Sequence, residues 1–383
     1  MLINRVNLIQ VADVQRYAWS RIALFQNIEH TCETICQLHA ISIGDKNSIV
    51  NAKRQAEQIK YCLLQAREYF DAAAVVSLAT KPVLLYYAAM SIALAEILLK
   101  QDGNSRLARL RADHNCHGLT LTLSSEPKPE NRLEDAASAL IAKAQYDQQG
   151  NPRGTFEIWR RSAREYPLAG WRIIQYPNGT QQRHFSMLTY PVDEPPPMLK
   201  PAGITLLDCL CELPYLQELL VRLKSRSGTV RANMTASGPL TEQTTQLIVQ
   251  PNPPELIEKF GQAVRVAPDS VNVLEFTDMP SGYIMRMPPN KQVSMTLPGA
   301  ISLNDEDAYF SCGDLNLGEF GFLYAALHIC GNFARYYPDV WLRHIDKCSP
   351  LAMAIDELCL CASDRLPLLL LTELLRTYHV LKK

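Results

Sequence analysis

The chain has 383 residues, of which 47% are hydrophobic and 20% charged, and its formal net charge is -1 at pH 7. This composition excludes an intrinsically disordered chain, which has few apolar residues and a high net charge. The charge balance also argues against a dedicated nucleic-acid-binding protein, which carries a basic excess or a dense basic stripe.

The first 124 residues are predicted to be mainly helical. The expected helices cover residues 4–25, 28–40, 49–79 and 82–100. Ser48 is the expected N-cap of the third helix, and Pro82 falls in the first turn of the fourth, where its missing N–H is not needed. The fourth helix is long enough to cross a bilayer, but Glu96 and its alanine content favour a helix buried inside a soluble protein. We therefore predict no contact with a membrane.

Strands are expected to appear among helices from residue 119 onward. Asn178-Gly179 between two apolar runs predicts a hairpin of residues 171–176 and 184–190. Helices are expected over residues 133–146, 205–224 and 253–264. Further strands are expected over residues 119–123, 228–235, 244–250, 271–277, 282–287, 291–297 and 308–312.

The last part of the chain returns to helix. Helices are expected over residues 319–337, 350–362 and 367–381, with Pro338 ending the first of them. The predicted fold class is α+β and mainly α-helical, with helical N- and C-terminal parts that pack together around a strand-rich middle insert. The corresponding segments are 1–124 (helical), 125–224 (Pro-rich, with hairpin and helix), 225–315 (strand-rich insert) and 316–383 (helical).

Motifs that would identify a cofactor, a metal or a familiar enzyme are absent from the sequence. It contains neither of the glycine-rich phosphate-binding patterns, and neither GxSxG nor HExxH. His114, Cys116 and His117 are the densest group of potential metal ligands, but no second pair of ligands accompanies them. We therefore predict neither a cofactor nor a metal.

The 11 cysteines and the start of the chain bear on location. The cysteines are scattered, several of them within apolar helical stretches, and the opening residues lack the pattern of a signal peptide. Free thiols without an export signal predict a cytoplasmic protein.

One pair of residues suggests catalysis. Arg109 and His114 are separated by four residues, a spacing that resembles the motif of the HEPN ribonucleases, which are helical proteins that cleave RNA. A histidine can move protons near neutral pH, and an arginine can stabilise the charge of a phosphorane. Arg109, His114 and the nearby His117 are the catalytic candidates, although the HEPN motif lies on a helix and this pair precedes a predicted strand.

Three other segments resemble the YaaC-like family of bacterial proteins. They read ATKPVLLYY (Ala79–Tyr87), HGL (His117–Leu119) and GNFARYYPDVW (Gly331–Trp341), in that order. The stretches ITLLDCLCELP (204–214) and PLLLLTEL (367–374) fit the same pattern, so the resemblance extends from about residue 60 to 375. It implies a bacterial cytosolic protein and points to no particular reaction. A part in anti-phage defence is inferred by analogy.

The motifs place cations beside aromatic residues. The candidate binding residues are Lys81, Tyr86, Tyr87, Arg335, Tyr336 and Trp341. If the two helical ends pack together, these residues could line one cleft with His117, a composition suited to anchoring a partner or stacking a base. In the alternative interpretation the same residues are structural, with the tyrosine hydroxyls satisfying buried groups and Arg335 pairing with a buried acid.

These observations favour an interaction or scaffold component of a multi-protein system. The expected partner is a protein, and the charge gives no indication of nucleic acid. The alternative is an RNA- or nucleotide-processing enzyme of the HEPN-like type. The sequence does not define the oligomeric state.

Overall fold

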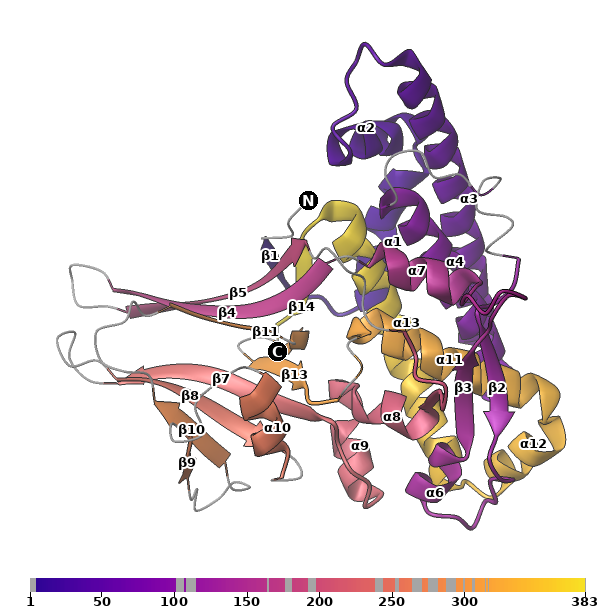
Figure 1. Cartoon of the computed structure of the whole chain (residues 1–383), viewed down its shortest axis with the longest axis vertical. Helices are drawn as coiled ribbons and strands as arrows, with labels where there is room; N and C mark the ends of the chain where they lie inside the picture. The colour runs from indigo at the N-terminus through magenta and orange to yellow at the C-terminus, as the bar shows by residue number, and fades with distance from the viewer. Residues whose placement is uncertain are drawn as a thin grey trace.

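The computed structural model consists of a body of helices, against which two sheets lie one above the other (Figure 1). The structure describes residues 5–100, 107, 115–163, 165–175, 181–191, 198–237, 244–251, 255–263, 271–274, 282–286, 294–298, 300–304, 307–313, 315 and 317–382. The predicted class is confirmed: the fold is α+β and mainly helical, and the helices from the two ends of the chain pack on one another.

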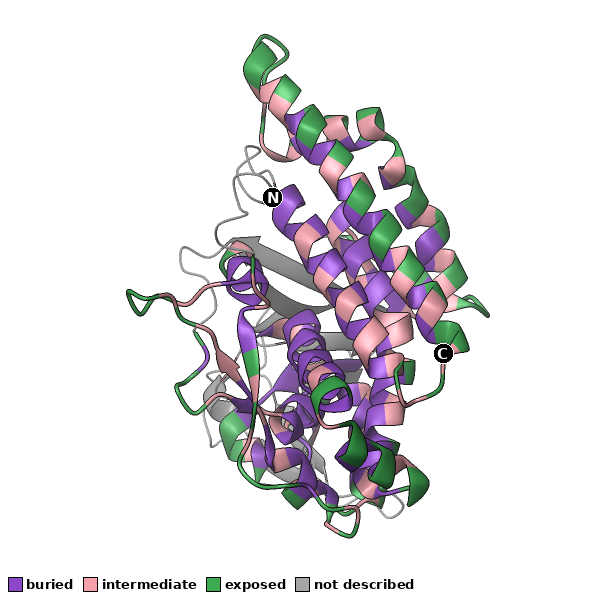
Figure 2. Cartoon of the chain, turned by 90° about the vertical axis from the view of Figure 1, so that its right-hand side faces the viewer, coloured by how far each residue is buried: buried purple, intermediate pink, exposed green. Residues whose placement is uncertain are grey.

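Helix α4 (Lys81–Lys100) is the centre of the helical body. It is in contact with α3 (Lys46–Val75), α7 (Thr155–Ser162), α11 (Gly318–Tyr336) and α13 (Pro350–Leu375). By length and composition α4 could cross a membrane, but 72% of its most apolar stretch is buried by these neighbours. Figure 2 shows buried residues where the helices face one another and exposed residues on the outer faces. A helix that is apolar on every side belongs in such an interior.

Local signals define the helix starts around α4. The side chain of Asp45 accepts a hydrogen bond of 3.0 Å from the backbone N–H of Ser48, so Asp45 rather than Ser48 is the N-cap of α3. Pro82 lies in the first turn of α4, as predicted. Two shorter helices, α1 (Val14–Ile22) and α2 (Ile28–Leu38), begin at the side-chain caps Asp13 and Asn27. Helix α2 packs along α3 at one end of the molecule (Figure 1).

The larger sheet has six strands in the order β12-β13-β7-β8-β10-β9. The second sheet has the order β11-β4-β5, and β4 pairs with β5 as predicted, while Asn178 and Gly179 of the expected turn lie outside the described residues. The strands are β4 (Glu165–Gln175), β5 (Gln181–Pro191), β7 (Thr229–Ser237), β8 (Thr244–Pro251), β9 (Val271–Leu274), β10 (Gly282–Arg286), β11 (Ser294–Pro298), β12 (Ala300–Asn304) and β13 (Asp307–Ser311). Helix α10 (Leu256–Ala263) covers the larger sheet, with the Phe260 ring 5.4 Å from that of Phe310.

A small third sheet lies against the helical body in the order β2-β3-β6. Its strands are β2 (Leu119–Leu123), β3 (Leu140–Ala144) and β6 (Ile204–Thr205). The remaining short helices are η1 (Ala23–Gln26), α6 (Leu133–Ser138), α8 (Leu206–Cys211), η2 (Pro214–Leu216), α9 (Gln217–Arg222) and α12 (Pro338–Asp346).

Several predicted helices are wrong where non-local contacts decide the structure. Residues 6–9 and 378–381 were expected in helices, but they form β1 (Val6–Ile9) and β14 (Tyr378–Leu381), which pair in parallel. The predicted helix over 133–146 divides into α6 and β3, because residues 140–144 pair with β2. The predicted helix over 205–224 breaks at Pro214.

The prediction that Pro367 begins a new helix is wrong, whereas Pro338 follows the end of α11 as predicted. Pro367 lies inside α13, which runs without a break from Pro350 to Leu375, and Pro338 opens α12 as well as following α11. A proline at the first position of a helix is favourable, whereas one inside a helix must be supported by packing. Pro367 is buried, which supplies that support.

The contact between α11 and α4 depends on Gly331. A Cβ atom at this position would lie 3.1 Å from the Tyr86 Cβ and 3.2 Å from the carbonyl oxygen of Pro82. Gly331→Leu is therefore expected to lower the free energy of unfolding by about 2 kcal/mol, as overpacked cores do. Urea denaturation measures the change. Gly44→Leu is the control, because a Cβ there would meet nothing within 4 Å. Equal stability of Gly331→Leu and the wild type would contradict this close helix contact.

Candidate functional site at the contact of α4 and α11

The three segments that resemble YaaC-like proteins meet at one place in the helical body. Arg335, at the end of α11, donates a hydrogen bond of 2.8 Å from Nη1 to the hydroxyl of Tyr87 on α4. The ring of His117, which precedes β2, lies 5.5 Å from that of Tyr86 and 6.3 Å from that of Tyr87. We call Tyr86, Tyr87, His117, Tyr324, His328 and Arg335 the motif cluster.

Backbone packing fixes the position of His117. Gly118 has a φ of +85° and Gly154 a φ of +93°, and a Cβ on Gly154 would lie only 2.3 Å from the backbone nitrogen of Gly118. This approach of two backbones requires glycine at both positions. The N–H of Phe156, in the first turn of α7, donates to the carbonyl of His117 at 3.2 Å. The segment that carries His117 is thus held against the start of α7.

The inner part of the motif cluster is buried and lacks hydrogen-bond partners. The ring of Tyr86 lies 5.8 Å from that of Tyr324 and 5.1 Å from that of His328. The hydroxyls of Tyr86 and Tyr324 interact with each other, but neither they nor Nε2 of His328 meet the geometry of a hydrogen bond with any described residue. Buried polar atoms are normally paired, so three such atoms in one cluster are a departure that function can explain.

The tautomer of His328 follows from its neighbour on the next turn. Asn332 donates from Nδ2 to the His328 carbonyl at 2.8 Å and approaches Nδ1 of the ring at 3.2 Å. With Nδ1 accepting, the ring proton lies on Nε2. His328 therefore presents an unpaired N–H donor beside the two unpaired hydroxyls.

Arg335, together with the neighbouring Tyr336, forms what we call the outer part of the motif cluster, and both residues are exposed to solvent. Tyr336 is 61% exposed, and the Arg335 guanidinium lies 5.2 Å from the centre of its ring. Tyr69 on α3 stacks on Tyr87 with a ring separation of 5.5 Å. An exposed arginine held between a hydrogen-bonded tyrosine and an aromatic ring is well suited to contact a partner.

Burial favours the neutral forms of the two histidines and of Tyr86 and Tyr324 in the motif cluster. Burial lowers the pKa of His328 to about 3, and the nearby His117 adds to this effect. Burial, and then the positive charge of Arg335, lower the pKa of His117. Burial raises the pKa of both Tyr86 and Tyr324. At neutral pH the site therefore has one cation beside a neutral imidazole that can accept a proton.

The remaining predicted site residues have different surroundings. Trp341 is 1% exposed and donates from Nε1 to the carbonyl of Ala79 at 3.2 Å, which ties α12 to the start of α4. Because Trp341 and Tyr86 are buried, neither offers a surface to a partner. Lys81 opens α4, and its charge lowers the pKa of Cys359 on α13 against the larger effect of burial. Arg109 and His114 lie outside the described residues.

The sequence analysis did not identify Tyr324, His328 or Asn332. These three residues follow one another at intervals of four along α11, so they form a polar stripe on a helix that is otherwise apolar. This spacing of polar residues is the sequence signal by which the three residues could have been recognised. Within the described part of the chain, no group of three histidine, cysteine, aspartate or glutamate side chains is arranged to hold a metal ion.

A family model described as YaaC-like protein matches residues 25–135. The matched segment contains α2, α3, α4 and β2, and it includes Tyr86, Tyr87 and His117 of the motif cluster. The resemblance to YaaC-like proteins is thus confirmed over this segment. No curated protein and no solved structure matches the chain.

Removal of an unpaired hydroxyl should cost little stability. Tyr324→Phe is expected to change the free energy of unfolding by less than about 0.5 kcal/mol, because the Tyr324 hydroxyl interacts with that of Tyr86 without the geometry of a full hydrogen bond. Thr31→Val is the control, since the buried Thr31 hydroxyl donates to the carbonyl of Phe25 at 2.7 Å. Its loss should cost about 1 kcal/mol. A loss as large for Tyr324→Phe, measured by urea denaturation, would mean that its hydroxyl is bound after all.

The buried His328 predicts a pH dependence of stability. Its pKa falls from an ordinary 6.5 to about 3 on folding, so its neutral ring stabilises the protein fully above pH 6.5, and this contribution is lost as the pH falls toward 3. Between pH 6.5 and about 5, the wild type should lose about 2 kcal/mol more than His328→Gln. The other histidines, apart from His117, which interacts with His328, contribute equally to both proteins. Parallel curves in urea titrations at several pH values would contradict the prediction.

Proposed function

We propose that the chain is an interaction component of a bacterial cytoplasmic multi-protein system, and that it binds a protein partner over the outer part of the motif cluster. The observation that carries this proposal is the exposed Arg335, held at 2.8 Å from Tyr87 and beside the exposed Tyr336. Arginine and tyrosine are enriched among the residues that dominate binding energy in protein interfaces. Anti-phage defence is the setting that we propose for this system.

The arrangement of the cluster also supports binding. Arg335 and Tyr87 come from different helices, which are packed together through Gly331, so their side chains are positioned before a partner arrives. Positioning of this kind reduces the entropy lost on association. All eleven cysteines are free thiols, which agrees with a reducing cytoplasm.

The test is recovery of the partner with and without Arg335. Tagged wild-type protein from its native host should retain one protein in a fixed stoichiometry, measured by mass spectrometry and light scattering. Arg335→Ala should weaken binding of the purified partner by at least roughly tenfold, the usual effect of losing a dominant interface residue, without lowering the melting temperature.

Arg222→Ala is the matched control. Arg222 is an exposed arginine on α9 that pairs with Glu218 at 2.6 Å, and its loss should leave partner binding unchanged. A wild-type chain that is recovered alone would contradict the proposal, and so would equal binding by both variants. Plaque counts on hosts carrying the wild type or Arg335→Ala test the proposed setting, since only the wild type should restrict phage.

A second function is favoured by the electrostatic effect of Arg335 on His117, whose pKa it lowers after the larger effect of burial. The HEPN-like alternative needs a cation beside a proton acceptor, the roles predicted for Arg109 and His114. Arg335 and His117 offer the same combination of residue types. If the chain processes RNA or nucleotides, purified protein should cleave a labelled RNA, and His117→Ala should abolish cleavage while the melting temperature stays unchanged. Absence of cleavage by the wild type would leave binding as the function of the site.

A further inference from the structure

A second site lies where the helical body joins the six-stranded sheet, away from the motif cluster. A cavity of about 470 Å³ is lined there by α8, by the start of α10 and by both chain connections between the body and the sheet. The outgoing connection contributes Arg226 and Gly228, and the returning one contributes Cys312 and Gly313. We call this cavity the hinge pocket. Its volume is within the range of natural sites for small molecules, about 300–1,000 Å³.

Glu212 is the unusual residue of the hinge pocket. Its side chain lines the cavity, yet the residue is only 6% exposed, and its Oε2 atom has no hydrogen-bond partner among the described residues. A Cβ on Gly228 or Gly313 would lie 2.7 or 2.5 Å from Glu212 Oε1, so both glycines are needed to make room for this carboxyl group. Burial raises the pKa of Glu212 to about 8, although a hydrogen bond with Ser311 opposes the shift. A buried acid without a full set of partners is costly unless a ligand completes it.

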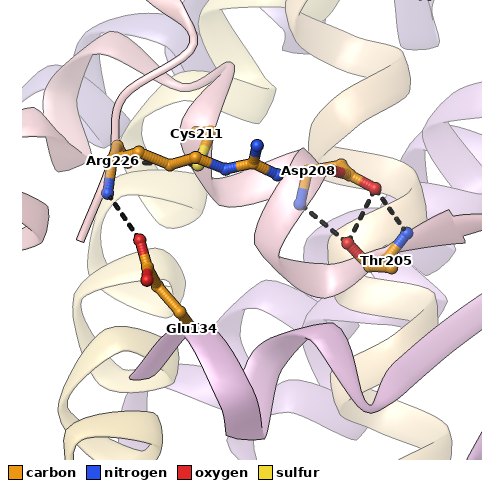
Figure 3. Close-up of polar contacts among 5 residues, drawn as sticks. All are labelled: Glu134, Thr205, Asp208, Cys211 and Arg226. Atoms are coloured by element: carbon orange, nitrogen blue, oxygen red, sulfur yellow. Dashed lines mark hydrogen bonds and ion pairs between the residues drawn. The ribbon is translucent and has the colours of Figure 1, made fainter. Parts of the chain in front are cut away.

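The rim beside Glu212 is held in place by the contacts drawn in Figure 3. Arg226 donates from Nη2 to Asp208 Oδ1 at 3.2 Å, and its backbone N–H donates to Glu134 Oε1 at 3.2 Å. Cys211 Sγ donates to the Arg226 carbonyl at 3.1 Å. Asp208 also forms a capping box with Thr205 at the start of α8. The charge of Arg226 is therefore already offset by Asp208.

The charges that remain in the hinge pocket are of both signs. Glu212 and Glu255 are acidic, and Lys200 and Lys259 are basic and exposed. A purely anionic ligand such as a nucleotide would face the two acids, and a simple amine would face the two lysines. A ligand that carries both charges satisfies both sides, with its amino group on Glu212 and its acid group on Lys259.

We propose that the hinge pocket binds a small molecule that carries both a protonated amino group and a carboxylate, which is the class of free amino acids and dipeptides. Such a ligand touches both connections between the helical body and the sheet. Its binding therefore stabilises the docking of the sheet on the body, and it does so independently of the partner surface at Arg335.

The test is a binding screen on the whole chain. Melting curves recorded with the standard amino acids, with a set of dipeptides and with the common nucleoside monophosphates should show an increase with at least one amino acid or dipeptide. Calorimetry then gives the affinity of that compound. Lys259→Ala, at an exposed position, should weaken it by at least roughly tenfold, whereas Arg222→Ala, outside the pocket, should leave it unchanged.

The pH dependence of binding identifies the role of Glu212. The charged and titratable groups facing its carboxyl are Asp208, Cys209 and Cys211 on α8, Arg226, Lys259 on α10 and Cys312. A protonated amino group favours the ionised carboxylate, so affinity should rise as the pH increases toward 8, until the amino group of the ligand loses its own proton. Glu212→Gln keeps the shape of the side chain and should remove this rise.

Three results would overturn the proposal. They are a wild-type melting temperature that no amino acid or dipeptide raises, an increase with nucleoside monophosphates only, and binding that is unaffected by Lys259→Ala. If Glu212→Gln does not fold, the proposal is still tested by the affinity of Lys259→Ala for the ligand and by the pH dependence of ligand binding to the wild type.

Discussion

The burial of α4 is the constraint on which the rest of this structure depends. A helix with apolar residues on every face has no side that water can solvate, so the chain must enclose it completely. Neighbouring segments alone cannot do this, and α7, α11 and α13 come from distant parts of the sequence to complete the enclosure. The packing that hides α4 also brings its tyrosines next to Arg335 and His117. The site at the motif cluster is thus a consequence of covering one helix.

The resembling segments combine two kinds of residue. Gly331, Trp341 and Tyr86 are buried and connect α11 and α12 to α4, so their contribution is to position other groups. Arg335 and Tyr336 remain exposed at the place where this packing ends. A motif read from sequence does not separate these roles, because both kinds of residue are needed for the same arrangement. The structural interpretation fits the buried members of the motif, and the proposed binding role concerns only its exposed members.

The sequence predicted what local patterns determine. The helix of α4 and the pairing of β4 with β5 were predicted from apolar and alternating patterns, and the expected packing of the two helical ends is observed. The prediction failed where a distant segment decides, as in the pairing of β1 with β14 and the packing that keeps Pro367 in a helix. The motif cluster and the hinge pocket differ in the same way, one being partly indicated by local sequence and the other formed by distant segments. Resemblance identified part of the motif cluster, whereas the hinge pocket joins residues far apart in the chain, and only the fold shows that Glu212 is buried between two glycines.

The parallel pairing of β1 with β14 also has a consequence for how the protein is made. Val6 pairs with Tyr378, so the N-terminal strand leaves the ribosome long before its partner exists. During that time β1 presents unpaired backbone groups to other chains, which is the usual risk of an exposed strand edge. Helices α3 and α4 can form while synthesis continues, because their contacts are close in sequence. Pairing of β1 with β14 is therefore a late event in folding, and until then β1 is exposed to pairing with other chains.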